Sequence, residues 1–251
     1  MTHVHSPLPL PELAWSTLLQ EALDLQKTEP LLTKVVEAVT SASSASEAIC
    51  RLLPKKLADH SIGEDKLRLL FSGIHAQNSD FENALVRDLM SSRQHDPAAR
   101  DIISIFLFYK GFHALQAHRI AHKLWNDGRH HIALHIQSRV SEVFSVDIHP
   151  GARIGFGVMM DHATGIVIGE TAVIGNNVLF WHGVTLGGRG AQQGDRHPKI
   201  GNGVWLGAQS TVLGAIKVGD NARIAANSVV TADVAAGDTV AGAPAKSVKK
   251  N

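Results

Sequence analysis

The sequence has only one cysteine, Cys50, among its 251 residues. A lone cysteine excludes a disulfide within the chain, and chains without disulfides are typical of reducing compartments such as the cytoplasm. We expect Cys50 to be a small buried hydrophobic side chain. No signal peptide is expected, because the first residues include Pro7, Pro9 and Pro11 and contain no apolar h-region. These absences together predict a cytoplasmic protein.

Long apolar runs and an excess of one charge are also missing. The longest apolar run, residues 102–109, is interrupted by Ser104 and is much shorter than the roughly 20 residues of a membrane-spanning helix. Lys and Arg number 24 against 23 Asp and Glu, which gives a formal net charge of +1. This balance is not basic enough to suggest nucleic acid as the main partner. Neither a membrane nor a nucleic acid is therefore expected as a partner.

Glycine is scarce in the first part of the chain, where apolar residues instead recur at helical spacing. Only four of the 22 glycines precede residue 145: Gly63, Gly73, Gly111 and Gly128. The helices that we expect cover 12–26, 31–39, 48–53, 64–77, 79–93, 111–125 and 129–144. Ser79 and Glu82 form a capping-box pattern at the start of one of them. We predict an all-helical domain over 1–145 and a second, glycine-rich domain over 146–251.

The second part carries a hydrophobic residue at every sixth position, with two breaks. The positions are Ile148, Ile154, Met160 and Ile166, then Ile168, Ile174, Phe180 and Leu186, then Ile200, Leu206, Val212, Val218, Ile224 and Val230. This period is typical of a parallel β-helix, in which each hexad forms one face of a triangular coil with its hydrophobic residue inside. Glycine often follows that residue and suits the corner. About a dozen hexads predict roughly four stacked coils.

The breaks in the six-residue period are where we expect the chemistry. The first break slips by two residues after a polar Asp161-His162 pair, and the second inserts eight residues between Leu186 and Ile200. Long excursions from a regular solenoid usually carry function. Asp147 precedes His162 by 15 residues, close to one coil, so we expect their side chains to lie near each other. A histidine beside a carboxylate indicates general-base catalysis, although a corner histidine at a subunit contact is an alternative.

Two features of the helical part have a structural and a functional interpretation. His118 and His122 are four residues apart and share a helix face, as a metal site would require, but no acidic or cysteine ligand lies near them in the sequence. We expect surface or interface histidines and no metal site. Asp96-Pro97 has the pattern of a helix N-cap followed by proline at the first helical position. A functional role for Asp96 can coexist with capping.

Several motifs together resemble the serine O-acetyltransferases. They are Asp147-Ile148-His149-Pro150, the run DHATGIVIGE over 161–170, TLGG over 185–188 and GDRHPKIG over 194–201, together with Asp96-Pro97 and residues 110–117 of the helical part. The resemblance covers nearly the whole chain. It implies a left-handed β-helix that forms homotrimers, paired into homohexamers by the helical domain. It also implies transfer of an acetyl group from acetyl-CoA to L-serine, the first step of cysteine biosynthesis, with L-cysteine as a competitive feedback inhibitor.

The resemblance also implies a role for each matching residue. His162 resembles the general base and Asp147 the residue that orients it. Among the substrate ligands, Asp96 and Asp161 resemble those of the serine ammonium group, and Arg196 and His197 those of its carboxylate. The backbones of Gly188, Ala208 and Ala226 match positions that line a CoA groove between subunits. No metal is implied.

Three other functions share this fold. A sugar or antibiotic acetyltransferase would use the same coil and CoA groove, but would have little reason for two acids and an Arg-His pair. A γ-class carbonic anhydrase binds zinc through three histidines, and no HxxxxH pattern occurs in residues 146–251. A non-catalytic scaffold would leave the Asp161-His162 break and the inserted loop unexplained.

The end of the sequence departs from the family. Many relatives end in a tail whose last isoleucine binds O-acetylserine sulfhydrylase, whereas this sequence ends Lys249-Lys250-Asn251. An amide and two lysines are poorly suited to an apolar pocket, because their desolvation is costly. Weak or absent binding of a sulfhydrylase is therefore expected.

Overall fold

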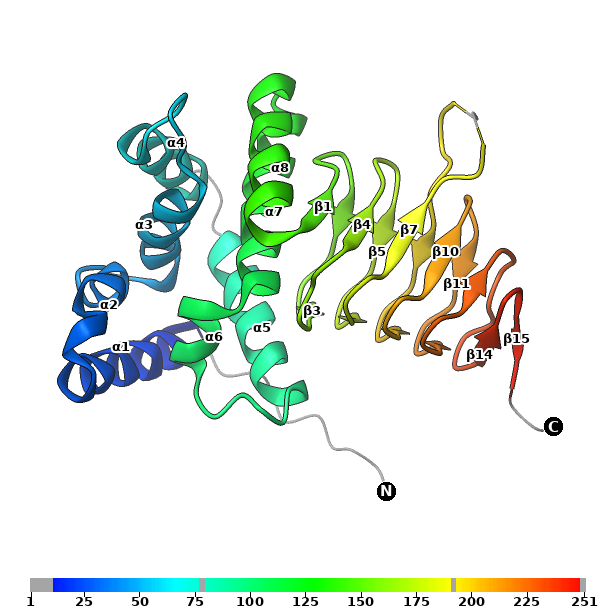
Figure 1. The fold of residues 1–251 in the computed structure, drawn as a ribbon, viewed down its shortest axis with the longest axis horizontal. Coiled ribbons are helices and arrows are strands. Elements are labelled where there is room, and N and C mark those ends of the chain that lie inside the picture. The colour runs from blue at the N-terminus through cyan, green and yellow to red at the C-terminus, as the bar shows by residue number, and fades with distance from the viewer. Residues whose placement is uncertain (1–10, 77–79, 191–192, 249–251) are drawn as a thin grey trace.

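The computed structural model describes residues 11–76, 80–190 and 193–248. Its first part is helical and its second part is a coil of short parallel strands, as the sequence predicts (Figure 1). The helices are α1 (Pro11–Thr28), the 3-10 helix η1 (Pro30–Leu32), α2 (Thr33–Thr40), α3 (Ala45–Leu57), α4 (Glu64–Ala76), α5 (Asp80–His95), α6 (Ile102–Phe108), α7 (Lys110–Asn126) and α8 (His130–Phe144). Lys249-Lys250-Asn251, on which the expectation about a sulfhydrylase rests, lies outside the described residues.

Helix α6 was not expected from the sequence. Its seven residues, IISIFLF, are apolar on nearly every side and therefore show no amphipathic period. Five of them are buried against the rest of the helical part, whereas Phe108 at its end is 49% exposed. The side chain of Asp101 caps the helix by accepting a hydrogen bond from the Ser104 amide at 2.9 Å.

The predicted capping box is only partly described, because Ser79 lies outside the described residues. Glu82 instead accepts hydrogen bonds from the amides of Ala45 and Ser46, the first residues of α3, at 3.2 and 2.9 Å. The Ser44 side chain accepts a third from Glu47. Glu82 therefore satisfies the start of a neighbouring helix, which ties α5 to α3.

Some histidines of the helical part are not where we expected them. His118 is buried, with 4% of its surface exposed, so the expected surface position is wrong for it; His113, on the same helix, is 1% exposed. They lie on α7, which packs against α8 and the first coil and is therefore covered along most of its length. Burial lowers the pKa of His113 to about 3. Both rings are thus neutral parts of the core.

The strands form three parallel sheets, one along each face of the coil. They are β1 (Val146–Ile148), β2 (Arg153–Ile154), β3 (Met159–Met160), β4 (Ile166–Ile168), β5 (Val173–Ile174), β6 (Leu179–Phe180), β7 (Thr185–Gly187), β8 (Lys199–Ile200), β9 (Trp205–Leu206), β10 (Thr211–Leu213), β11 (Lys217–Val218), β12 (Arg223–Ile224), β13 (Val229–Val230), β14 (Thr239–Gly242) and β15 (Ala245–Ser247). Sheet A has the order β1-β4-β7-β10-β13, sheet B β11-β8-β5-β2 and sheet C β15-β14-β12-β9-β6-β3. Among the strands of the described residues, only β15 is antiparallel to its neighbour.

The pairing register explains both breaks in the six-residue period. Ile148 pairs with Ile168, 20 residues later, whereas Ile168 pairs with Leu186 after 18. Leu186 in turn pairs with Val212 after 26 residues. The two extra residues lie at the corner between β3 and β4, and the eight extra residues between β7 and β8. Sheet A has five strands, so the expected four coils are one too few: β14 closes a last turn beyond the final hexad.

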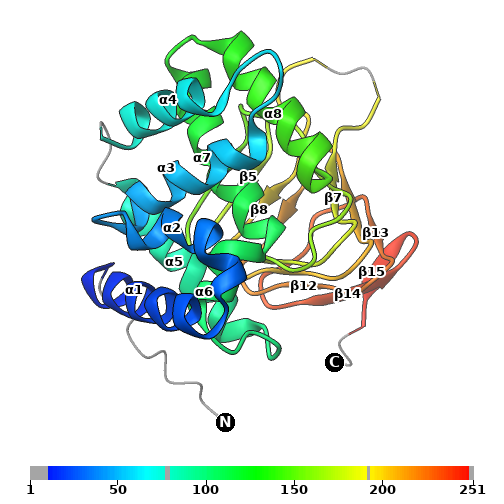
Figure 2. The same cartoon turned by 60° about the vertical axis from the view of Figure 1, so that its left-hand side comes forward.

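The helices stack on one end of the coil (Figures 1 and 2). Helices α5 and α7 contact β3, and α8 contacts β1. At this junction the buried Asp88 carboxylate accepts hydrogen bonds from Arg119 at 2.7 Å, from Gln116 and from the Val158 amide. Arg119 also donates to the carbonyl of Gly155. This network joins the helices to the first coil. The division into two domains at residue 145, and the hand of the coil, stay predictions.

Across the described ranges, no helix is long and apolar enough to span a membrane.

Candidate active site

The first break forms the corner between β3 and β4, residues 161–165, which we call the His162 corner. His162 and Ala163 both have positive φ, 53° and 59°, so the chain turns in the left-handed region there. The start of α7 lies directly against this corner. A Cβ added to Gly111 would lie 2.1 Å from the Met160 carbonyl oxygen, so only glycine permits this approach.

A pocket of about 370 Å³ opens between the His162 corner and the helices. It is lined by Asp96, Ala98, Phe108, Tyr109, Lys110, Gly111, Met160, Asp161 and His162. The His162 side chain is 75% exposed, and its Nε2 lies 3.7 Å from Asp161 Oδ2. That distance is too long for a hydrogen bond, but it places a negative charge beside the ring. A histidine with this exposure is accessible to a ligand in the pocket.

Asp96 does not cap a helix, so that interpretation of Asp96-Pro97 is wrong. Helix α5 ends at His95, and the residues after Asp96 form a turn in which Ala98 donates its amide hydrogen to Asp96 Oδ1 at 2.8 Å. The Tyr109 hydroxyl donates to the other oxygen, Oδ2, also at 2.8 Å. Burial, with the Asp96 hydrogen bond next, raises the pKa of Tyr109 to about 12. Tyr109 is thus a stable donor that fixes Asp96 at the pocket.

The second break forms a loop between β7 and β8 that projects from the coil (Figure 1). Arg196 and His197 lie at its end. Arg196 Nη2 donates to Glu170 Oε2 at 2.7 Å, and this hydrogen bond lowers the pKa of the Glu170 carboxyl. The Thr171 hydroxyl oxygen accepts the backbone amides of Arg196 and His197, both at 3.1 Å. Two consecutive residues of the preceding coil therefore hold the loop end.

The His197 ring is fixed in one tautomer. The Thr171 amide donates to His197 Nδ1 at 3.2 Å, and the Thr171 hydroxyl lies 2.9 Å from the same nitrogen. Nδ1 is therefore an acceptor, and the ring hydrogen of the neutral form is on Nε2. Burial lowers the pKa of His197, and the charge of Arg196 lowers it further. The ring packs onto Gly169, where an added Cβ would lie 2.0 Å from Nε2.

Asp147 faces outward from sheet A and is paired in register with Val167. Gln137 of α8 donates a hydrogen bond to its carboxylate at 2.6 Å. In the described part of this chain the carboxylate within 4 Å of His162 is that of Asp161. The first coil is 20 residues long, so Val167, five residues after His162, is the residue in register with Asp147. The orientation of His162 by Asp147 stays a prediction.

Ala208 and Ala226 lie on the same edge of the coil as His162. Backbone hydrogen bonds of 2.8 Å join Gly183 to Thr164 and Gln209 to His182, and one of 2.9 Å joins Asn227 to Ala208. The edge therefore rises from His162 through His182 and Ala208 to Ala226, one residue per coil. Gly188 lies on another edge, where β7 ends, with the Arg196 side chain 3.5 Å from the position of an added Cβ.

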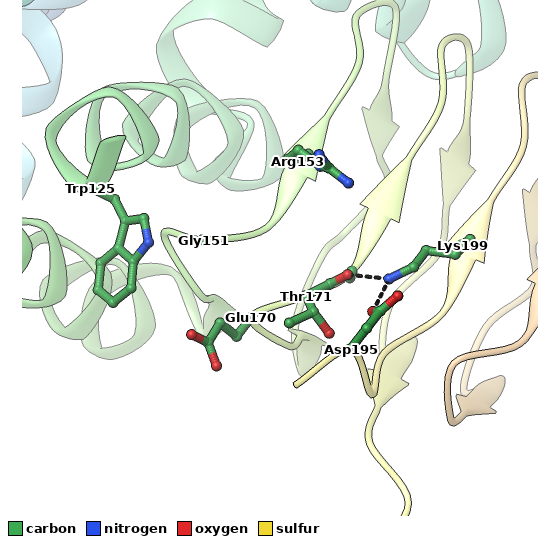
Figure 3. Close-up of a pocket in the computed structure, with 8 residues that line it drawn as sticks. Trp125, Gly151, Arg153, Glu170, Thr171, Asp195 and Lys199 are labelled. Carbon is green, nitrogen blue, oxygen red and sulfur yellow. Dashed lines mark hydrogen bonds and ion pairs between the residues drawn. The ribbon is translucent and has the colours of Figure 1, made fainter. Parts of the chain in front are cut away.

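A second pocket, also of about 370 Å³, lies on sheet B beside Glu170 and Thr171 (Figure 3). Arg153, Asp195 and Lys199 line it, and Trp125 of α7 forms one wall. Lys199 donates to the Thr171 carbonyl and is paired with Asp195. Within the described ranges, no group of three or more His, Cys, Asp or Glu side chains is placed to hold a metal ion.

The candidate residues thus fall into two groups at opposite ends of the sheet A strands. Asp96, Asp161 and His162 lie where β4 begins, and Arg196 and His197 lie where it ends, against Gly169. Gly165 and Gly169 are four residues apart, which corresponds to about 13 Å along a strand. The sequence did not reveal Tyr109, Gln137, Glu170 and Thr171 as supporting residues. Only Glu170, at the end of the quoted 161–170 run, stood within a motif.

Residues 14–117 match the family model of the serine acetyltransferase N-terminal region, and residues 197–232 match the six-repeat bacterial transferase hexapeptide model. A probable serine acetyltransferase 4 of Oryza sativa subsp. japonica is 51% identical over 236 residues, which are 93% of this chain and 75% of the relative.

The chain belongs to the serine acetyltransferase family.

Solved structures of this family have the same fold. Soybean serine acetyltransferase complexed with serine is 44% identical, with a TM-score of 0.93 over 97% of this chain and 100% of that one. A serine acetyltransferase complex with cysteine is 42% identical, with a TM-score of 0.94 over 96% of this chain and 100% of that one. Family membership thus covers both the helical part and the β-helix.

Proposed function

We propose that this protein is a serine O-acetyltransferase, which transfers the acetyl group of acetyl-CoA to the hydroxyl of L-serine in cysteine biosynthesis. The observation that carries the proposal is a histidine beside a carboxylate, in an open pocket, in a chain that belongs to the serine acetyltransferase family. The serine complex of the soybean relative supports serine as the acceptor. The cysteine complex of another relative supports cysteine as an inhibitor that competes for the same site.

In this proposal His162 is the general base. Its ring takes the proton of the serine hydroxyl while the serine oxygen attacks the thioester carbonyl carbon. The carbon–sulfur bond then breaks, and His162 returns the proton to the CoA thiolate. Serine oxygen attacks directly, so no acyl-enzyme forms. Asp161, 3.7 Å from the ring, favours the imidazolium that exists between the two proton transfers. Asp147 is proposed to orient His162.

The charged groups of serine require ligands of both signs. Asp96 and Asp161 are proposed to bind the ammonium group, and both carboxylates line the His162 pocket. Arg196 and His197 are proposed to bind the carboxylate. Arg196 is suited to a planar, bidentate contact, and the Nε2–H of His197 is a further donor. Cysteine carries the same two charged groups, and so it should occupy the same ligands.

One chain does not hold both sets of ligands close enough for one serine. The ammonium and carboxylate groups of serine are bonded to the same carbon, whereas the two groups of residues are separated by about 13 Å along sheet A. We propose that the Arg196 end of one copy meets the His162 corner of the next, in a homotrimer that forms a closed ring. The helical part, 1–145, is proposed to pair two such trimers into a homohexamer.

The donor is proposed to lie in the groove between two copies, along the backbones of Gly188, Ala208 and Ala226. The two alanines leave room at the coil edge above His162, and Gly188 lies at the Arg196 end. The same interface between two copies would therefore form both the acetyl-CoA site and the serine site. No metal has a role in this chemistry. We also propose that the protein is located in the cytoplasm, because its one cysteine, Cys50, cannot form a disulfide within the chain.

Acceptor analogues test this function. Ethanolamine lacks the serine carboxylate and 3-hydroxypropionate lacks the ammonium group, so each should lose one set of ligands. We expect kcat/KM to fall by about tenfold or more for each, as expected when hydrogen bonds to a charged group are lost. Amino sugars should not be acetylated. Equal rates with serine and ethanolamine would contradict the proposed ligands, and preference for a sugar acceptor would contradict the function.

A further inference from the structure

The start of α7 contacts the His162 corner through two consecutive residues. Lys110, the first residue of the helix, donates a hydrogen bond from its ammonium group to the Thr164 hydroxyl at 2.5 Å. Next to it, a Cβ added to Gly111 would lie 2.9 Å from the Cβ of Ala163, which is fully buried. The helix therefore covers the residue that follows His162 and binds the side chain of the one after that.

The position of His162 depends on the backbone on either side of it. Its own side chain is 75% exposed, and the nearby Asp161 carboxylate is too distant for a hydrogen bond. Before it, the Asp161 amide donates to the Phe180 carbonyl at 2.8 Å. After it, the Thr164 carbonyl accepts the Gly183 amide, also at 2.8 Å. His162 thus lies on a short turn between two fixed points, and the direction of its ring follows from the conformation of that turn.

This turn has an unfavourable backbone conformation. His162 and Ala163 both lie in the left-handed region, with φ of 53° and 59°, which residues other than glycine seldom adopt. Such a conformation costs free energy and persists only where the surrounding structure holds it. If Thr164 were held less firmly, the turn could relax toward ordinary φ values. The His162 ring would then point away from the pocket.

The Lys110 ammonium group is engaged with Thr164 and not with the carboxylates of the pocket. Lys110 lines the same pocket as Asp96 and Asp161, but it forms no ion pair with either of these described residues. Both carboxylates therefore remain available to an ammonium group of the acceptor. A charged donor also makes a stronger hydrogen bond than a neutral one, which suits a contact that holds a strained turn.

We propose that Lys110 is a positioning residue, whose hydrogen bond to Thr164 holds the His162 corner in the left-handed turn that directs the base at the acceptor hydroxyl. This inference rests on the proposed function, since it concerns the same base. Lys110 itself touches no reacting atom and exchanges no proton with the substrate. The helical part then contributes to the orientation of the base as well as to the pocket wall.

Substitutions at both ends of the hydrogen bond test the inference. Lys110→Met keeps the length of the side chain and removes the donor, and Thr164→Val keeps the shape and removes the acceptor. Each should lower kcat by about three- to tenfold, the effect of one lost hydrogen bond. The double variant should lose no more than either single variant, because both remove the same interaction. Lys110→Arg keeps a charged donor and should recover part of the loss.

A change in kcat without a change in KM distinguishes positioning from a contact with the substrate. KM for L-serine and inhibition by L-cysteine should stay the same in Lys110→Met, because Asp161 is held separately by the Phe180 carbonyl. A direct contact of Lys110 with the serine carboxylate would instead raise KM for L-serine and would have no effect with ethanolamine as acceptor. Lys123→Met is the matched control, since Lys123 lies on the same helix and is paired with Asp127 away from the pocket. Its kcat and KM should equal those of the wild type.

Three kinetic results would overturn the inference. The first is an unchanged kcat in Lys110→Met, and the second is an effect on KM for L-serine alone. The third is a double variant whose loss is the product of the two single losses, because Lys110 and Thr164 would then act independently.

The inference and the proposed function can fail separately. If the wild-type protein shows no serine-dependent reaction, the proposed function fails. Crystal structures of the wild-type protein and of Lys110→Met then still test the inference, because His162 and Ala163 should leave the left-handed region, or adopt more than one conformation, in the variant. An unchanged turn would overturn the inference. An active wild-type enzyme with an unaffected Lys110→Met variant would leave the function intact and remove the positioning role.

Discussion

Mixing two inactive variants would show whether two copies build each site. His162→Ala removes the proposed base and should lose about 10²- to 10⁴-fold in kcat. The double variant Arg196→Ala, His197→Ala removes the proposed carboxylate ligands at the other end of sheet A. Each protein alone should be nearly inactive. In a mixed ring, an interface is complete when the first variant supplies its intact Arg196 end and the second supplies its intact His162 corner.

The expected recovery follows from counting interfaces. If two variants mix at random in equal amounts, each position in the ring is filled by either one with a probability of one half, so roughly a quarter of the interfaces are complete in a ring of heterologous contacts. Refolding the variants together, followed by a serine-dependent rate assay, should therefore recover roughly a quarter of wild-type activity.

A matched mixture provides the control. Asp96 and His162 line the same pocket of one chain, so a mixture of Asp96→Ala and His162→Ala contains no complete interface and should stay inactive. Activity in this control would indicate that wild-type protein is present in the preparations, because neither variant has an intact His162 pocket. If the first mixture also stays inactive although mixed oligomers form, both ligand groups must come from one chain. The proposed sharing of each site between two copies would then be wrong.

Three further predictions concern single sites and stability. Asp96→Asn keeps one acceptor oxygen, for the Ala98 amide, and replaces the acceptor of the Tyr109 hydroxyl by an NH2 group; it also removes the charge. KM for serine should therefore rise by about tenfold in steady-state kinetics, and cysteine inhibition should weaken similarly. Unchanged values would leave Asp96 only a role in the turn. Asp88→Ala leaves the Arg119 guanidinium buried without its carboxylate, so it should lower the free energy of unfolding by about 3–5 kcal/mol in denaturant titrations. The control is Asp65→Ala, which breaks an exposed ion pair and should change the free energy of unfolding by less than about 1 kcal/mol. Burial lowers the pKa of His75 to about 4 and that of His113 to about 3, below the ordinary 6.5, so only the unfolded chain binds these protons between those values. The contribution of these histidines to the free energy of unfolding is therefore fully present above pH 6.5. The free energy of unfolding should decrease as the pH falls toward 4, by up to about 1.4 kcal/mol per pH unit for each histidine. A free energy of unfolding that does not change over this range would show that the two rings are not held neutral in the folded protein.

The β-helix was predictable because a hydrophobic residue recurs at every sixth position of the sequence. Each inward position, such as Ile168 or Leu186, must be hydrophobic to stack on its copies, and the two breaks located the His162 corner and the projecting loop. The count of coils was less accurate, since β14 continues after the hexads have ended. Helix α6 was missed because its residues are apolar on nearly every side, so the sequence shows no polar face.

The supporting contacts of the site could not be read from the sequence. Glu170 and Thr171 hold Arg196 and His197 across 26 residues, through a register that depends on the length of the inserted loop. Tyr109 reaches Asp96 only because the turn after α5 places the carboxylate beside the start of α7. Burial of His118 likewise depends on the packing of α7 between α8 and the first coil. The motifs indicated the candidate site residues, whereas the hydrogen-bond partners of these residues could be identified only from the structure.

Thiol release from acetyl-CoA tests the central claim most directly. Free CoA is measured with a thiol reagent at fixed acetyl-CoA, with and without L-serine, and the product is identified by its mass. We predict a slow rate without serine, a saturable increase with L-serine, and one O-acetyl-L-serine formed for each thiol released. A rate that does not depend on L-serine, or thiol release without O-acetyl-L-serine, would contradict the proposed function.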